Sequence, residues 1–281
     1  MHTHTHEYTA QGAPNAGAHG IRSELGLGGK VEMDLRSTVL VVGGSLCSFK
    51  LLNTLVRFLP TLEPACKKQW KWRNTWTSLA HSALTGAWAV LCLHRQPQML
   101  EDLITSHSLL SHSLVAVSTG YFIHDFLDVG LNQPLKQSWE LLVHHGTVIS
   151  CFSLAVTSRL YVSLAVVSLL IEIHSVFLHI RMLLLLSGRR NRPGTEATAA
   201  RPSVAYNLTR WLNMGTLLVF RVCTMGWMTR WLASHFDLLP RFVLMMGTVG
   251  TSLISMMNVV LFYRLLRADF LTNTHNSNSN H

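Results

Sequence analysis

Charged residues are scarce in this sequence. Asp, Glu, Lys and Arg make up 13% of the 281 residues, about half of the roughly 25% that is typical of soluble domains. The mean hydropathy is positive, at +0.27. This composition excludes an ordinary soluble domain and predicts that much of the chain lies in a membrane.

The sequence also lacks paired cysteines and an N-terminal stretch that resembles a signal peptide. The five cysteines are scattered and form no CxxC pair, which excludes a disulfide framework or a zinc site, and we expect no bound metal. The first thirty residues contain no apolar stretch of signal-peptide length and are rich in Gly, Ala, His and Thr. We therefore expect residues 1–36 and 268–281 to form disordered tails.

Basic residues exceed acidic ones, with 23 Lys and Arg against 14 Asp and Glu. Most of them stand in short clusters between long apolar runs, as membrane topology signals do, and not on one water-facing patch. Nucleic acid is therefore not an expected partner.

Apolar segments long enough to cross a bilayer, which needs about 20 helical residues, follow the N-terminal tail. The first is the weakest, because Lys50, Asn53 and Arg57 interrupt it, and the fourth and fifth should form a hairpin at a turn near Arg159. The pattern predicts an all-α, multi-pass transmembrane bundle of six to seven spans within residues 37–267. The segments are 37–59, 76–94, 109–127, 141–158, 160–186, 211–233 and 242–264.

The distribution of positive charge predicts the orientation of the bundle. The connections after the first, third and fifth spans, together with the C-terminal tail, contain 11 Lys and Arg, and the opposite side contains 6. Positive residues are retained on the cytosolic side. We expect the N-terminus outside the cytosol, the C-terminus inside it, and the long connection 187–210 on the cytosolic side.

Several ionisable residues fall inside or at the ends of the predicted spans, where each costs a few kcal/mol or more unless it faces a cavity or a partner. With the predicted orientation, most of them lie in the cytosolic half of the membrane. The alternative for each is a structural one, a hydrogen bond between helices worth about 0.6–2 kcal/mol. They are His81, His124, Asp125, Asp128, His144, His145, Glu172, His174, His179, Arg181 and Arg221.

At the acidic end of the third span, helical periodicity places a histidine and a carboxylate on the same face. His124 and Asp128 are four residues apart and share a face. A loop of about twelve residues then leads to the fourth span, so this end can approach His144 and His145. Carboxylates beside histidines stabilise the imidazolium and suit the pair to proton transfer.

The fifth span carries two polar stripes. Glu172 and His179 are seven residues apart on one stripe, and His174 and Arg181 form another on a nearly opposite face. Because both stripes cannot line one cavity, only one of them belongs to a site.

Four segments together resemble the TLC domain, which is found in translocation-associated membrane proteins and ceramide synthases. The most specific part is a His pair after Trp-Glu, with Phe-Ile-His-Asp upstream and an acid on the next helix. The resemblance covers roughly residues 38–270. The segments are WKWRNTWTSLAHSALTGAWAVL (70–91), GYFIHDFLD (120–128), SWELLVHH (138–145) and VVSLLIEIHSVFLHIRMLLLLS (166–187).

The resemblance implies an acyl-transfer centre. In ceramide synthases of this family, a His pair and two acids on the following helix form that centre. Here His144 and His145 match the pair, Glu172 falls at the first acid, and Ser175 replaces the second. We therefore do not expect ceramide synthesis, and we expect the Glu172 stripe to face a cavity that His81, His124, Asp125, Asp128, His179 and Arg221 also line.

The resemblance also implies a role in adjusting the acyl composition, and hence the fluidity, of cell-membrane phospholipids, at the plasma membrane or alternatively the endoplasmic reticulum. As an enzyme the protein would use acyl-CoA as co-substrate and no other cofactor. His145 would act as general base or acyl acceptor, oriented by His144 and Glu172. As a regulator it would bind phospholipids or fatty acyl chains without chemistry, and the sequence leaves both open.

Two other classes of membrane protein fit the sequence poorly. A di-iron desaturase needs about eight histidines in boxes such as HxxHH, and no HxxHH is present. A seven-span receptor of the common type carries Asp/Glu-Arg-Tyr after the third span and Asn-Pro-x-x-Tyr in the seventh, and both are missing.

The predicted orientation can be tested at the N-glycosylation sequon Asn207-Leu208-Thr209. Glycans are added on the lumenal side, so a cytosolic Asn207 should stay unmodified. We expect no mobility shift on glycosidase treatment of the protein from secretory cells. A glycan at Asn207 would reverse the orientation of this connection.

Overall fold

The computed structural model describes residues 33–59, 68–188 and 203–268, and within these ranges the ordered elements are helical, with no strand. This confirms the all-α prediction. Most of the two predicted tails, residues 1–32 and 269–281, lies outside the described residues. The elements are α1 (Leu35–Leu55), η1 (Val56–Phe58), α3 (Gln69–Arg95), η2 (Pro97–Leu100), α4 (Leu109–Asn132), α5 (Leu135–Ser158), α6 (Val162–Ser168), α7 (Ile171–Leu186), α8 (Val204–Thr216), η3 (Leu217–Cys223), α9 (Thr224–Ser234) and α10 (Arg241–Leu266).

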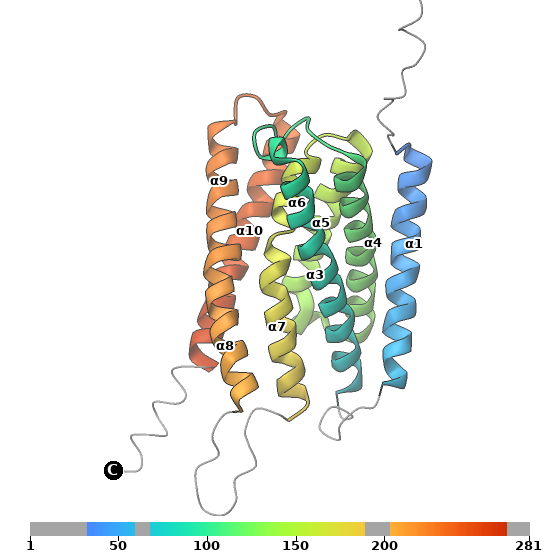
Figure 1. Ribbon diagram of the computed structural model, residues 1–281, viewed down its shortest axis with the longest axis vertical. Coiled ribbons are helices and arrows are strands. Elements are labelled where there is room, and N and C mark those ends of the chain that lie inside the picture. Colours follow the sequence, from blue (N-terminus) through green and yellow to red (C-terminus); the bar gives the residue numbers. More distant parts are fainter. Residues whose placement is uncertain (1–32, 60–67, 189–202, 269–281) are drawn as a thin grey trace, which may run out of the picture. The chain divides into compact units, whose positions relative to one another are not determined.

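Each predicted span corresponds to a helical segment of the described chain. Five of these segments are long and apolar enough to cross a membrane: Leu35–Phe58, α4, α5, Val162–Leu186 and α10. The other two are α3, which carries many polar side chains, and the run α8–η3–α9. Figure 1 shows both lying alongside the other helices of the bundle. The chain is thus a multi-pass membrane protein, with two spans that hydropathy alone identifies less clearly.

The connections differ in length from those expected. The predicted loop of about twelve residues after the third span is reduced to Gln133 and Pro134, because the polar ends of α4 and α5 stay helical beyond the apolar core. The hairpin near Arg159 is confirmed. Its reversal uses left-handed backbone at Arg159 (φ 60°) and Tyr161 (φ 64°), a conformation uncommon for residues other than glycine.

The predicted fifth span is interrupted. It consists of α6 and α7, and the backbone between them tightens at Leu169 and Leu170. There the Glu172 N–H donates to the Leu169 carbonyl (3.0 Å) and the Ile173 N–H to that of Leu170 (3.1 Å). These are three-residue bonds of the 3₁₀ type, and they place the break immediately before Glu172.

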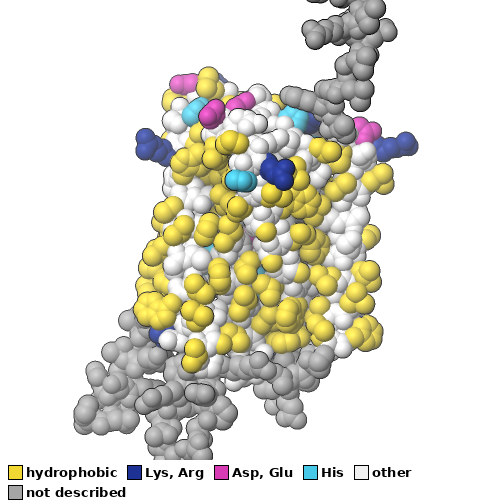
Figure 2. Space-filling model, in the orientation of Figure 1, with side chains coloured by type: hydrophobic (Ala, Val, Ile, Leu, Met, Phe, Trp, Pro, Cys, Tyr) yellow, Lys and Arg dark blue, Asp and Glu magenta, His cyan; other side chains and the backbone are white. Residues whose placement is uncertain are grey.

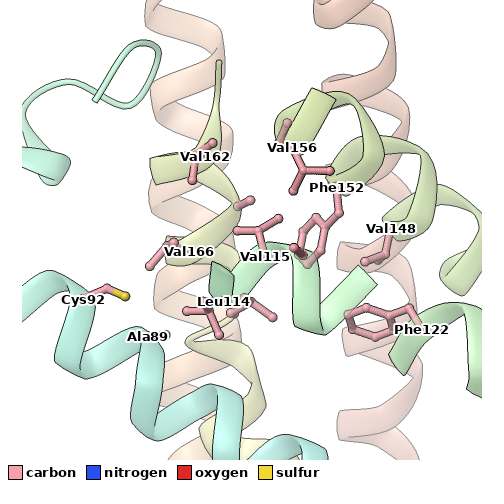
Figure 3. Packing of buried hydrophobic residues seen from close by; sticks show 14 of the residues in the cluster. Ala89, Cys92, Leu114, Val115, Phe122, Val148, Phe152, Val156, Val162 and Val166 are labelled. Atoms are coloured by element: carbon pink, nitrogen blue, oxygen red, sulfur yellow. The ribbon is translucent and has the colours of Figure 1, made fainter. Parts of the chain in front are cut away.

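The apolar core surrounds α4. In the apolar 18-residue stretch of α4, 67% of the residues are buried, whereas in that of α10 only 11% are buried. Helix α4 is therefore central in the bundle and α10 is peripheral. Figure 3 shows Leu114 of α4, Phe152 of α5 and Val166 of α6 packed in one cluster. Figure 2 shows apolar side chains spread over the flank of the bundle. Because lipid is itself apolar, such a bundle is held by close packing and hydrogen bonds more than by exclusion of water.

Glycine allows one very close helix contact, between α1 and α4. A Cβ at Gly120 would collide with the Val42 carbonyl oxygen and with the Ser45 side chain. The Ser45 hydroxyl donates to the Val117 carbonyl at 2.6 Å. The missing side chain at Gly120 therefore lets two backbones approach and form an interhelical hydrogen bond.

We predict that Gly120→Val displaces α1 and destabilises the protein. Overpacking typically costs about 1–3 kcal/mol, and a backbone oxygen cannot rotate away. Gly43→Val is the matched control, because a Cβ at Gly43 meets nothing within 4 Å. Thermal unfolding in detergent should show a lower melting temperature for Gly120→Val than for Gly43→Val, and equal values would refute this packing argument.

Candidate functional site

A polar cavity of about 280 Å³ lies inside the bundle between α3, α4, α5, α7, η3 and α10. At its rim Glu140 and Arg264 approach to 3.5 Å, and both side chains are exposed. Inside this rim, its wall combines apolar side chains with six Asp, Glu, His and Arg residues from four elements. These six are Asp125, His144, His145, Glu172, His179 and Arg221.

The structure brings the His pair to the acidic end of α4. His145 Nδ1 lies 3.5 Å from Asp125 Oδ2, and both side chains are buried. The distance is long for a hydrogen bond, so the contact is electrostatic. Asp125 Oδ1 also accepts from Asn74 Nδ2 at 2.5 Å, which fixes the carboxylate. Asp125, and not Glu172, is therefore the carboxylate in contact with His145.

Glu172 and Arg221 occupy another part of the cavity wall. Glu172 Oε2 accepts from the Ser82 hydroxyl at 2.6 Å. Arg221 donates through Nη1 to Asn258 Oδ1 (2.9 Å) and through Nη2 to Ser175 Oγ (3.0 Å). The hydrogen bonds of Arg221 thus go to neutral groups. Glu172 interacts with it electrostatically across the cavity, without an ion pair within 4 Å in the described chain.

Glu172 and Arg221 both lie where the helical backbone is irregular. Glu172 follows the break between α6 and α7, and Arg221 lies in η3, a π-helical turn between α8 and α9. Isolated π turns occur frequently at functional sites. The two irregularities place a carboxylate and a guanidinium against the same cavity.

The second stripe of α7 faces away from this cavity. His174 Nδ1 lies 3.2 Å from the Thr216 hydroxyl of α8, and the Arg181 guanidinium lies over the Tyr206 ring at 5.7 Å. Glu172 and His179 line the cavity, whereas His174 and Arg181 connect α7 to α8.

Three residues that were expected to line the cavity lie outside its wall. His81 is fully buried and stacks on Tyr121, with ring centroids 3.7 Å apart. Asp128 accepts from the Trp70 indole at 2.9 Å. His124 is also buried. Helical spacing placed them at the correct ends of their helices, but side-chain packing turns them behind the wall.

Four Asn and Ser residues of the cavity wall were not singled out from the sequence. Asn74, Ser78 and Ser82 follow each other at four-residue spacing along α3, and Asn258 of α10 is the fourth. The α3 series has the helical period of a face turned to a polar space, so it could have been found. Within the described chain, no group of three or more His, Cys, Asp or Glu side chains is arranged to hold a metal ion.

These features define the class of the protein: a multi-pass helical membrane protein with a histidine–carboxylate cavity inside the bundle. The family model of the TLC domain (TRAM, LAG1, CLN8) matches residues 71–267. The chain therefore belongs to the TLC domain family.

Named relatives cover most of the chain. It is 48% identical over 239 residues to TLC domain-containing protein 2 of Danio rerio, which covers 85% of this chain and 93% of the relative. The human TLC domain-containing protein 2 is 41% identical (83% and 84% covered). TLC domain-containing protein 1 of Gallus gallus is 36% identical (82% and 87% covered). Similarity thus extends over nearly the whole bundle.

The position of Ser175 generates a prediction about ceramide. Where the second acid of a ceramide synthase is expected, Ser175 instead accepts a hydrogen bond from Arg221. We expect the purified protein, given acyl-CoA and a sphingoid base, to form no ceramide detectable by mass spectrometry, while a ceramide synthase purified in the same way does. Robust acylation would show that Glu172 suffices without a second acid.

Proposed function

We propose that this protein adjusts the acyl composition of membrane phospholipids, and hence membrane fluidity, at the plasma membrane, with its N-terminus outside and its C-terminus in the cytosol. One observation carries the proposal: buried His145 contacts buried Asp125 in a cavity that Glu172 and Arg221 also line. Such a cavity supplies His145 as a base, Asp125 as the carboxylate partner of that base, and Arg221 as a cation that can stabilise an oxyanion.

The chemistry proposed is acyl transfer from acyl-CoA. His145 Nδ1 faces Asp125, so Nε2 is the nitrogen left for a substrate. Nε2 takes the proton of an acceptor hydroxyl or amine while that acceptor attacks the thioester carbonyl, and Asp125 stabilises the imidazolium that forms. The proton then passes to the departing CoA thiolate. His144, whose ring centroid lies 5.4 Å from that of His145, adds a second group beside the reacting atoms.

An adjoining apolar cavity supports an acyl substrate. It has a volume of about 130 Å³ between α5, α6, α9 and α10, and Val148, Phe152 and Met246 are among its lining residues. Ile254 lines both this cavity and the polar one. An acyl chain entering here would place its carbonyl end toward the His pair.

We predict that His145→Asn abolishes the effect of the protein on phospholipid acyl chains while leaving its abundance unchanged. General acid–base catalysis typically contributes about 10²–10⁴-fold in rate, and an amide cannot supply it. Asp125→Asn and Glu172→Gln test the two carboxylates, and His107→Asn, at a partly exposed position outside the cavity, is the control. The measurement is lipidomics of cells that express each variant at equal level.

The same experiment separates catalysis from binding. If His145→Asn and Asp125→Asn are well expressed and give a wild-type acyl profile, the acyl-transfer mechanism is wrong. The protein would then act on phospholipid composition by binding or regulation.

A further inference from the structure

A second, larger space lies at the side of the bundle. It has a volume of about 560 Å³ and is formed by η3, α9 and α10. We call it the lateral groove. Arg221 and Asn258 line the lateral groove and also line the polar cavity. The two spaces therefore meet at this hydrogen-bonded pair, whose Nη1 to Oδ1 distance is 2.9 Å.

The lateral groove lies on the membrane-facing side of these helices. Leu218, Val222 and Val259 line it and are 47%, 50% and 68% exposed. Figure 1 shows α9 and α10 side by side at one edge of the bundle. In a bilayer such apolar, exposed side chains contact lipid chains, so the groove is open to lipid.

The charges of the lateral groove favour an anionic group. Arg221 and Arg230 line it, and no Asp or Glu is among its described lining residues. Arg221 Nε and Asn258 Nδ2 are buried donors without a hydrogen-bond partner in the described chain. A buried unsatisfied donor is costly, and a guanidinium edge is suited to bidentate binding of phosphate. The unused donors therefore point to a ligand with phosphate oxygens.

We propose that the lateral groove is the entrance by which a membrane lysophospholipid reaches the polar cavity, with its phosphate on Arg221 and Asn258. Its one acyl chain lies along the apolar wall of η3, α9 and α10, and its free glycerol hydroxyl is the acceptor whose proton His145 takes. A CoA thioester is water-soluble and enters from the cytosolic rim instead. This inference rests on the proposed function and deepens it, because it names the acyl acceptor class and its route.

Glycine positions on one helical run give a sharp test. Gly226 lines the lateral groove, Gly215 does not, and a Cβ at either meets nothing within 4 Å. Gly226→Trp should fill the groove without disturbing the fold, and Gly215→Trp is the matched control. Equal melting temperatures of the two variants will show that both are folded.

The probe is a photoactivatable lysophosphatidylcholine in lipid nanodiscs, with cross-linked residues mapped by mass spectrometry. We expect labelling of groove residues in wild-type protein and Gly215→Trp, and at least about a tenfold loss in Gly226→Trp. Arg221→Gln should weaken labelling by about 10-fold or more, as for loss of a charged hydrogen bond. Wild-type labelling of the groove in Gly226→Trp would overturn the proposal.

Two further measurements distinguish failure of the proposed entrance from failure of the proposed acyl transfer. A photoactivatable fatty acid that labels the groove when lysophosphatidylcholine does not would overturn the lysophospholipid as occupant. His145→Asn should keep groove labelling even though it loses the lipid effect. Labelling without an acyl-profile effect in wild-type protein would contradict the acyl-transfer function but retain the entrance, whereas an effect without labelling would contradict the entrance alone.

Discussion

The interior of this bundle is organised by the cost of placing ionisable groups in a membrane, which is a few kcal/mol or more for each group without a partner or cavity. Asp125 satisfies this constraint through Asn74 and His145, and Glu172 satisfies it through Ser82. Each of these contacts crosses between helices. The polar groups that surround the cavity therefore also fix how α3, α4, α5 and α7 pack, and site and fold cannot be altered independently.

Irregular backbone makes room for this arrangement. The break before Glu172 and the π turn around Arg221 lie on helices that meet at Ser175, which accepts from Arg221 at 3.0 Å. Regular helices would turn these side chains to other directions, since each residue advances the helix by about 100°. The distortions are thus coupled to the charges that they position, and the same π turn places Arg221 where the cavity meets the lateral groove.

The sequence predicted the features that depend on local composition and period. Apolar length located the spans, and the period of 3.6 residues separated Glu172 and His179 from His174 and Arg181 on α7. The break at Leu169 and the π turn at Leu217–Cys223 could not be predicted, because neither contains Gly or Pro as a signal. The position of His81 behind the cavity wall is a packing result, since its ring stacks on Tyr121, a contact that a single helix does not specify.

The polarity of α3 follows from the same constraint. Hydropathy gives this helix a weak signal because Asn74, Ser78 and Ser82 interrupt its apolar character. Two of these residues are partners of buried carboxylates: Asn74 donates to Asp125, and Ser82 donates to Glu172. A helix that satisfies buried carboxylates must itself be polar on that face. Weak hydropathy at 76–94 is therefore a consequence of the site and not evidence against a span. Helix α3 therefore combines a weak hydropathy signal with the hydrogen-bond donors that two carboxylates of the cavity need.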